Sequence, residues 1–444
     1  MKILLAGINA RYTHSNPALR YLREMVADLP HETMLREFSI NMPVLHVAEE
    51  IRSAHPDVVA LSIYIWNARF AADLAALLRL MMPDVVIVAG GPEVSYRAAA
   101  WLEEVPAVDI VIEGAGEAAF RELAQNGFPR EERIVRRANP PFAGIPFLYR
   151  SGFDGLDNRY IYYESSRGCP FSCSYCLSSR GDQATDFRPL DMVCRELDAI
   201  LERKPRLVKF VDRSFNADPA RARAIWKHLI ARGAGTTFHC EIHPLLLEEE
   251  DFALLSSAPQ GLFQFEIGVQ STNARTLGEI GRPVEWNAIK DSLSRLVAMK
   301  HIHTHLDLVV GLPYDDLASI GAAIDRVLSL GADHFQLGFL KALHGTELRT
   351  RAAEFGLAFE PFSPYEIISN NWLSPDDLAL LRRVEQLIES FVNPHGLDAL
   401  LSQLAEKEGW FSLLKRLDEH CRMSGFDIST KNVKRCETAV RQMQ

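Results

Sequence analysis

The amino-acid sequence predicts an α/β protein with two successive sets of parallel strands and a helical C-terminal region. Three observations support this fold class. Short apolar runs alternate with amphipathic segments over residues 1–127, the alternation resumes at Tyr160, and strand patterns end near Gly345. Strands that alternate with helices along a chain are typical of parallel sheets whose faces are covered by helices.

Residues 1–127 contain five apolar runs that we expect to be strands, each followed by a segment with helical periodicity. The strands are expected in KILLAGI, ETMLREFSI, VVALSIY, VVIVAGG and DIVIEGA. Helices are expected over residues 16–29, 44–53, 67–82, 96–103 and 117–125, where apolar residues recur three and four positions apart. This order predicts a doubly wound, Rossmann-like domain.

Residues 128–158 interrupt the alternation. They are rich in proline and charged residues, as in FPREERIVRRANPPFAGIPF, and show no sustained periodicity. Such a composition is typical of a connection between domains. We therefore expect an interdomain linker here.

The second set of strands spans residues 159–345. Strands are expected in RYIYYESS, LVKFVDR, TTFHCEI, LFQFEIGVQ, THLDLVVGLP and HFQLGFLKA, with helices between them, for example over residues 190–203 and 220–232. Six strand–helix repeats predict a partial parallel barrel, because a complete one needs eight. Residues 346–444 are expected to form a helical domain, in which Ser374 and Pro375 begin one helix as N-cap and first helical residue.

Charge and hydropathy exclude two classes of partner. The net charge of −10 argues against bulk nucleic acid and anionic membranes.

The apolar run at the N-terminus is short and no cleavage site follows, so it indicates a strand and not a signal peptide. No apolar stretch is long enough to span a bilayer. We expect a cytoplasmic protein, in which clustered cysteines indicate metal or redox chemistry more often than disulfides.

Three cysteines lie close together in CPFSCSYC, with the spacing C-x3-C-x2-C formed by Cys169, Cys173 and Cys176. A structural zinc site usually needs four ligands, and no fourth is nearby. Three thiolates can hold a [4Fe–4S] cluster and leave one iron open for a further ligand. A three-cysteine zinc site and a chance cluster of thiols are the alternatives. The loop follows the first strand of the second set, at the end of the strand that faces the active site in parallel α/β folds.

This spacing resembles the hallmark of the radical S-adenosylmethionine (SAM) superfamily, which has an aromatic residue, here Tyr175, before the last cysteine. FVDRSFN, FEIGVQST, DLVVGLP and QLGFLKALHGTEL fall in the order of that superfamily's later strands, so the resemblance covers residues 160–345. It implies that Cys169, Cys173 and Cys176 are both the cluster ligands and the catalytic centre. The open iron would then bind SAM, and its reductive cleavage would give a 5′-deoxyadenosyl radical.

The same resemblance implies contacts with SAM. Glu266 and Gln270 are four apart in a strand, so they point the same way. An arginine suits the SAM carboxylate, since a guanidinium binds that group with two hydrogen bonds. The residues assigned to SAM are Tyr175, Asp212, Glu266, Gln270, Arg282 and Asp307. Each charged member has a structural alternative, an ion pair within the barrel. The second strand carries VDRS in place of the superfamily's Gly-Gly-Glu pattern.

The loops of the first domain resemble those of the cobalamin-binding domain in cobalamin-dependent radical SAM enzymes. SIYIWN, AGGPEVS and EGAGEAAF match most closely, over about residues 1–127. The fingerprint D-x-H-x-x-G is absent, as is the dinucleotide motif G-x-G-x-x-G. His14 is the histidine available to cobalt, and Arg11, Tyr12 or Trp66 are alternatives for that face. The expected cobalamin-binding residues are Asn9, Arg11, Tyr12, His14, Ser62, Tyr64, Trp66, Asn67, Gly90, Gly91, Pro92, Glu93, Ser95, Gly114, Gly116 and Glu117.

Together these resemblances imply a methyltransferase that uses a [4Fe–4S] cluster, SAM and cobalamin, transferring a methyl group from methylcobalamin to a substrate radical. A cyclase or rearrangement enzyme without methyl transfer is the alternative, and a non-catalytic cofactor-binding sensor is a third. The resemblance also implies an electron donor such as flavodoxin or ferredoxin. The substrate, a small molecule or a peptide, is not identified by the sequence.

Overall fold

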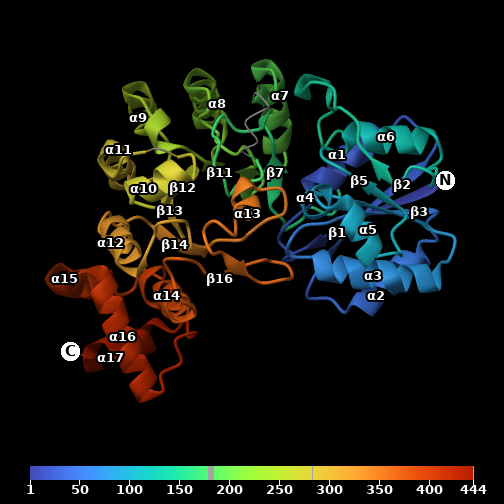
Figure 1. Ribbon diagram of the computed structural model, residues 1–444. Coiled ribbons are helices and arrows are strands. Elements are labelled where there is room, and N and C mark those ends of the chain that lie inside the picture. The colour runs from blue at the N-terminus through green and yellow to red at the C-terminus, as the bar shows by residue number, and fades with distance from the viewer. Residues whose placement is uncertain (179–184, 283, 444) are drawn as a thin grey trace.

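The computed structural model describes residues 1–178, 185–282 and 284–443. Figure 1 shows three parts, with the N-terminal domain and the C-terminal helices at opposite ends and a second sheet with its helices between them. The predicted fold class, a doubly wound domain followed by a six-stranded partial barrel and C-terminal helices, is confirmed.

The N-terminal domain is a parallel sheet with the strand order β2-β1-β3-β4-β5-β6. Apolar side chains of α2, α3 and α5 pack on one face of the sheet, and those of α1 and α6 pack on the other, so the domain is doubly wound. Its strands are β1 Lys2–Asn9, β2 Glu32–Ser39, β3 Val58–Ser62, β4 Val86–Gly90, β5 Ile110–Ile112 and β6 Ile134–Val135. Its helices are α1 Pro17–Met25, α2 Val44–Ser53, α3 Ala68–Met81, α4 Pro92–Ser95, α5 Ala98–Glu104 and α6 Glu117–Gln125.

Strand β6 lies within the segment expected to be a linker. It pairs in parallel with β5, and the Val111 and Glu113 amides donate to the carbonyls of Arg133 and Val135. A strand of two residues leaves no periodic pattern in the sequence, so only its neighbours in space identify it. The sheet therefore has six strands among the described residues, one more than expected.

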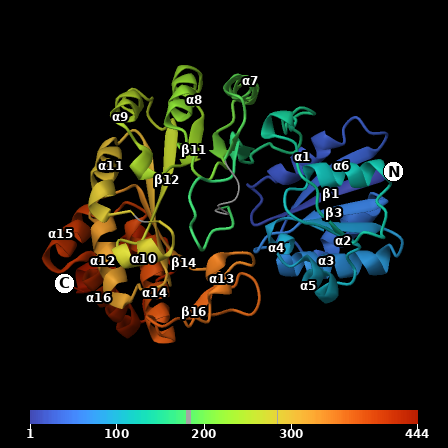
Figure 2. The ribbon, with the colours of Figure 1, turned by 45° about the horizontal axis from the view of Figure 1, so that its top comes forward.

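The second sheet has the order β14-β13-β12-β11-β10-β7, and all its pairings are parallel. Helices α7, α8, α9, α11 and α12 lie on its outer side (Figure 2). Its strands are β7 Ile161–Tyr163, β10 Leu207–Phe210, β11 Thr237–Glu241, β12 Phe263–Gln270, β13 His303–Val310 and β14 His334–Phe339. The helices are α7 Leu190–Leu201, α8 Pro219–Arg232, α9 Glu249–Leu255, α10 Ala274–Glu279, α11 Trp286–Ala298 and α12 Leu317–Leu328. A short antiparallel pair, β8 Ser166–Arg167 and β9 Asp186–Phe187, flanks the cysteine loop.

The C-terminal part begins with a hairpin, and its long helices start at Pro375. Residues 346–374 hold α13 Glu347–Thr350 and the antiparallel strands β15 Ala358–Phe359 and β16 Ile367–Ser369. Ser374 is the N-cap of the next helix, as expected, and forms a capping box with Asp377. The following elements are α14 Pro375–Leu387, the π-helical turn η3 Ile388–Val392, α15 Asp398–Glu408, α16 Trp410–Ser424 and α17 Val433–Met443.

Two contacts fix the N-terminal domain against the rest of the chain. The loop after β1 runs beside the start of β7, where the Tyr160 amide donates to the Thr13 carbonyl (2.7 Å) and Ser15 Oγ donates to the Tyr160 carbonyl (2.9 Å). On the other side, the Tyr365 hydroxyl of the hairpin segment donates to Glu93 in α4. In the described part of the chain, no helix is long and apolar enough to cross a membrane.

Candidate functional site

The cysteine loop is held by backbone contacts with two distant segments. The Ser174 amide donates to the Ile280 carbonyl (3.0 Å), and the Ser174 carbonyl accepts from the Leu348 amide (2.9 Å). Gly281 has φ +73°, and a Cβ atom there would lie 2.5 Å from the Ser172 carbonyl oxygen. The loop therefore passes against a backbone that only glycine allows.

The three thiols form one electrostatic group. Burial raises the pKa of the Cys173 thiol, the adjacent Arg282 guanidinium opposes this shift, and the charges of Cys176 and Cys169 add to it. Cys169 Sγ lies 3.7 Å from Ser214 Oγ. Among the described residues, no three His, Cys, Asp or Glu side chains are gathered closely enough to hold a single metal ion. Thiolates are the ligands that [4Fe–4S] clusters take, so the chemistry of these three donors fits such a cluster.

Two residues assigned to SAM border this loop. Arg282 Nη2 donates to the Gly268 carbonyl of β12 (2.7 Å), which keeps the guanidinium between β12 and Cys173. The Tyr175 hydroxyl lies beside Cys173, and burial raises the pKa of Tyr175. Both side chains therefore lie beside Cys173, and their contact with SAM stays a prediction.

Asp212 holds the chain just before the cysteines. It is buried, and its carboxylate accepts from the Ser165 amide (2.9 Å), Ser165 Oγ (2.6 Å) and Ser166 Oγ (2.7 Å). Burial raises the pKa of this carboxyl, and the hydrogen bonds from Ser165 and Ser166 oppose that shift. These contacts favour a positioning role for Asp212, and its direct contact with SAM stays a prediction.

The inner face of the barrel is polar. Strand register places Tyr162, Lys209, His239, Gln264 and His303 in one row across five neighbouring strands. Glu241, Glu266, His305 and His334 form the next row. Complete parallel barrels fill this space with branched apolar side chains. This barrel instead presents ionisable groups, a feature suited to a polar ligand.

Most of these ionisable groups are paired. Glu266 Oε2 lies 2.9 Å from His239 Nε2, and this contact lowers the pKa of Glu266. His305 Nε2 lies 3.0 Å from Asp307 Oδ1. Burial lowers the pKa of His305, but Asp307 outweighs it and the net shift is upward. Gln270, the last residue of β12, has φ +70°. Glu266, Gln270 and Asp307, all assigned to SAM, thus belong to two adjacent strands of one wall.

The expected cobalamin residues gather at the carboxyl ends of β1, β3, β4 and β5, and several of them shape the loops. Asn67 accepts from the Tyr64 amide (2.8 Å) and donates to the carbonyls of Ile8 and Ser62. Ser95 Oγ donates to the Gly91 carbonyl (2.8 Å) and accepts from the Gly114 amide (3.0 Å). The hydrogen bonds of Asn67 connect the ends of β1 and β3, and those of Ser95 connect the loops that follow β4 and β5.

Gly91 lets two of these loops meet. Its φ is +116°, and a Cβ atom there would lie 2.4 Å from the Ile63 carbonyl oxygen. Gly90 ends β4, Gly91 is the N-cap of α4, Pro92 is its first residue, and Gly116 is the N-cap of α6. Of the glycines predicted to allow a close approach, Gly91 therefore acts between the loops themselves, whereas no atom lies within 4 Å of a Cβ at Gly114.

Two expected cobalamin residues form interdomain contacts. Glu93 is buried and bonds with Tyr365, whose hydroxyl also accepts from Arg97 Nη1 (3.1 Å). Glu117 Oε1 lies 2.6 Å from Arg167 Nη2, and Glu164 Oε2 lies 3.0 Å from the same nitrogen. Burial raises the pKa of Glu164 to about 7, and Arg167 opposes that shift.

Arg11, Tyr12 and Trp66 remain exposed, and Trp66 stacks on the Tyr64 ring with 4.3 Å between centroids. The imidazole of His14 is oriented towards the barrel: its Nδ1 lies 2.5 Å from the Tyr162 hydroxyl. Burial, then Lys209 and Arg11, lower the pKa of His14. Asn9 Nδ2 donates to the His14 carbonyl (2.9 Å). The cobalamin loops and the inner face of the barrel therefore meet at His14 and Tyr162.

Sequence reasoning missed five residues of this region: Tyr162, Arg167, Lys209, His239 and Glu241. Four of them occupy inward positions of strands, where a polar residue alternates with apolar ones, as in LVKFV. That alternation was the available signal. Arg167 had none, because its partner Glu117 belongs to another domain.

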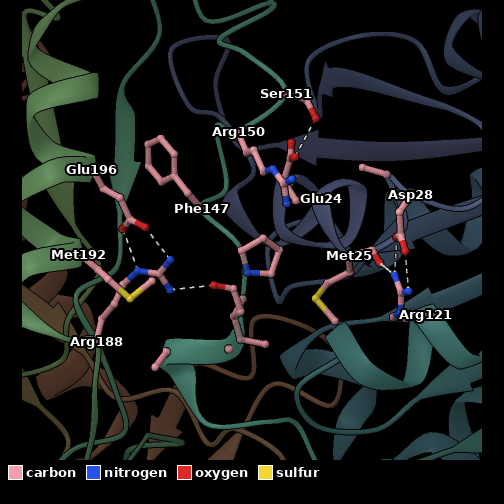
Figure 3. Close-up of a pocket in the computed structure, with 15 residues that line it drawn as sticks. Glu24, Met25, Asp28, Arg121, Phe147, Arg150, Ser151, Arg188, Met192 and Glu196 are labelled. Carbon is pink, nitrogen blue, oxygen red and sulfur yellow. Dashed lines mark hydrogen bonds and ion pairs between the residues drawn. The ribbon is translucent and has the colours of Figure 1, made fainter.

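A separate cavity of about 690 Å³ lies between α1, α7 and residues 143–151 (Figure 3). Two pairs of its charged groups are bonded to one another, Arg188–Glu196 and Arg121–Asp28, each at 2.6 Å. None of the expected site residues lines it.

Comparisons with protein families match three regions of the chain. Residues 3–124 match the B12 binding domain, residues 163–327 match the Radical SAM superfamily, and residues 353–435 match a protein family of unknown function, DUF4080. Both resemblances inferred from the sequence are confirmed.

Two curated relatives are methyltransferases. The cobalamin-dependent radical SAM methyltransferase TokK of Streptomyces tokunonensis is 26% identical over 67% of this chain and 49% of its own length. The 2-(S-pantetheinyl)-carbapenam-3-carboxylate methyltransferase of Streptantibioticus cattleyicolor is 28% identical over 62% of this chain and 45% of its own. The chain thus spans about half the length of these relatives.

Solved structures share the fold. The cobalamin-dependent SAM radical enzyme OxsB, with aqua-cobalamin bound, superposes with a TM-score of 0.72 at 14% identity, covering 100% of this chain and 79% of OxsB. The methyltransferase TsrM of Kitasatospora setae gives 0.64 at 17% identity, covering 84% of this chain and 80% of TsrM. The chain therefore joins a B12-binding domain to a Radical SAM domain, followed by a region of a family of unknown function.

Proposed function

We propose that this chain is a cobalamin-dependent radical SAM methyltransferase acting on a small molecule. The observation that carries the proposal is the Glu117–Arg167 ion pair, because it joins an expected cobalamin loop to the segment that leads into Cys169. The names of TokK and TsrM, both methyltransferases, support the same reaction class. We propose domain boundaries at residues 1–127, 128–158, 159–345 and 346–444, with the connecting segment 128–158 supplying the edge strand β6 to the first sheet.

In this proposal, Cys169, Cys173 and Cys176 hold the cluster, and Glu266, Gln270, Arg282 and Asp307 surround SAM. The bound cluster supplies the electron that cleaves SAM, and cobalamin carries the methyl group. The protein's own task is positioning. Asp212 fixes the start of the cysteine loop, and Arg282 keeps a cation beside Cys173, where the carboxylate of SAM can bind it.

The proposed cobalamin surface is the group of loops at the ends of β1, β3, β4 and β5. Trp66 and Tyr12 present exposed aromatic faces there, and His14, oriented by Tyr162, supplies a neutral imidazole. We also propose a cytoplasmic location and a low-potential electron donor of the flavodoxin or ferredoxin class, since the cluster needs one electron for each SAM cleaved.

The test is anaerobic reconstitution with iron, sulfide and hydroxocobalamin, followed by reductant and SAM. Formation of 5′-deoxyadenosine and S-adenosylhomocysteine, with a product heavier by one methyl group when substrate is present, supports a methyltransferase. 5′-Deoxyadenosine with a rearranged product instead supports a cyclase or rearrangement enzyme. A protein that binds its cluster but never cleaves SAM would be the sensor.

The cluster assignment has its own control. Ala at Cys169, Cys173 or Cys176 should abolish cluster absorbance and SAM cleavage, whereas Cys194→Ala, in α7 outside the triad, should leave both unchanged. Retained SAM cleavage in a triad variant would refute the assignment. Purified protein that takes up no cobalamin would refute the proposed role of residues 1–127.

A further inference from the structure

Two inward-facing charges of the barrel have no partner in the described part of the chain. Lys209 of β10 and Glu241 of β11 form no ion pair or hydrogen bond through their side chains, although both lie on the inner face. Lys209 contacts only an aromatic ring, with Nζ 5.9 Å from the centroid of Tyr160. Both side chains are half-buried.

The neighbouring ionisable side chains are paired with one another, in contrast to Lys209 and Glu241. His239 is paired with Glu266, and His305 is paired with Asp307. His334 lies 3.7 Å from Glu389, at the start of η3. A shielded charge is unfavourable unless something compensates it, so native proteins normally pair such groups. A lysine and a carboxylate left open on one wall are therefore groups that a ligand would satisfy.

The two charges reach the same space. Lys209 is level with His239, and Glu241 lies two residues further along that neighbouring strand. Adjacent strands are about 4.8 Å apart, and two residues add about 6.6 Å along the strand. Lys209 also influences the pKa values of both His14 and Glu241, so it lies between the cobalamin loops and the carboxylates of the barrel.

We propose that the barrel binds a small substrate of the amino-acid type, with an ammonium and a carboxylate group close together. Lys209 binds the carboxylate and Glu241 binds the ammonium group. Exposed Arg213, which follows the end of β10, lies close enough to Glu241 for its charge to lower the pKa of that carboxyl. The inference rests on the proposed function, since it assigns the substrate to the space between the proposed SAM and cobalamin sites.

The experiment uses the full chain reconstituted with its cluster and hydroxocobalamin, in the presence of S-adenosylhomocysteine. Calorimetric titration with each of the twenty L-amino acids identifies the tightest binder, and its amine and its deaminated acid are then compared with it, for example tryptamine and 3-indolepropionate beside L-tryptophan. Each truncated probe should bind at least about tenfold more weakly, because each loses one charged hydrogen bond.

Matched variants assign the two charges. In Lys209→Met the amino acid should bind no better than its amine, and in Glu241→Gln no better than its deaminated acid. Lys209→Arg should restore the preference for the carboxylate. Lys227→Met and Glu250→Gln change exposed residues of the same charge and should leave every affinity unchanged.

Three results would overturn the inference: no amino acid binds, the tightest binder is unaffected by both variants, or the variants lose S-adenosylhomocysteine or cobalamin instead. The last result would assign the charges to a cofactor. Failure of the proposed function is distinguishable, because it shows in the products of the SAM-cleavage assay and not in these amino-acid affinities. Cluster absorbance and far-UV circular dichroism of each variant show whether it has folded.

Discussion

Arg167 Nη2 lies 2.6 Å from Glu117 Oε1, so that the start of α6 in the N-terminal domain is paired with the residue two positions before Cys169. The two side chains are only 22% and 8% exposed. Phe142 lies under the guanidinium, 4.5 Å from its carbon to the ring centroid. This ion pair is therefore shielded from water, unlike most pairs on the surface.

Arg167→Met should lower the free energy of unfolding by about 2–3 kcal/mol, because it leaves Glu117 and Glu164 shielded without their cation. Urea unfolding measures the change. The matched control is Arg195→Met, whose partner Asp191 lies 2.7 Å away with both side chains about two-thirds exposed. That change should cost less than about 1 kcal/mol. Equal losses in the two variants would mean that the Glu117–Arg167 pair contributes no more than a surface pair.

Gly281→Ala should impair cluster assembly although all three cysteines remain. The new Cβ would lie 2.5 Å from the Ser172 carbonyl oxygen, at a positive φ, so the cysteine loop has to move. Iron and sulfide content after reconstitution measures the effect. Gly278→Ala, in the same helix region but with no atom within 4 Å of its Cβ, should load normally. Normal loading of Gly281→Ala would show that the loop tolerates displacement.

Glu241→Gln should stabilise the protein at alkaline pH and not at acidic pH. Burial raises the pKa of Glu241 from 4.5 to about 7, so the folded state binds this proton more tightly than the unfolded state. The contribution of Glu241 to stability is then present below pH 4.5 and is lost as the pH rises through about 7. Unfolding free energies should agree at pH 4 and differ at pH 8 by up to about 3 kcal/mol.

The control for this pH dependence is Glu250→Gln, which changes an exposed carboxyl and should give the same small difference at both pH values. A constant difference between Glu241→Gln and the unmodified protein across this range would contradict the raised pKa of Glu241.

Lys209→Met should raise the pKa of His14. Burial is the main cause that lowers it, and the Lys209 charge is the second, so removing the charge leaves only burial and Arg11. Titration of the His14 ring protons by NMR in the unloaded protein detects the shift. Lys227→Met should have no effect. An unchanged His14 pKa would mean that Lys209 does not face the loop after β1.

The fold class and most strand positions could be predicted from the sequence, because each strand is a run with a continuous or alternating apolar pattern. FQFEIGVQ is an example, in which every second residue is buried. Strands β6, β15 and β16 could not be predicted in this way. They have two or three residues each, too few for any period, and depend on neighbours far along the chain.

The cysteine ligands could be predicted because their spacing is local. The environments of Asp212 and Glu93 could not, because their partners Ser165 and Tyr365 are distant in sequence. Lys209 could have been proposed as a site residue from the sequence, because it is the one charged residue in the apolar run LVKFV, at an inward position. A charged residue in an apolar strand, with no oppositely charged residue beside it in the run, indicates a candidate binding site.

The backbone hydrogen bonds between Ser174 and its two partners also affect the stage of synthesis at which the cluster can be inserted. Ile280 and Leu348 leave the ribosome long after the cysteines do, so the nascent loop lacks both anchors for much of translation. Until then its thiols are exposed to oxidation and to stray metals. We therefore expect the cluster to be inserted only after residue 348 has been synthesised. Chains truncated before that residue should accept a cluster poorly from a cluster-transfer protein.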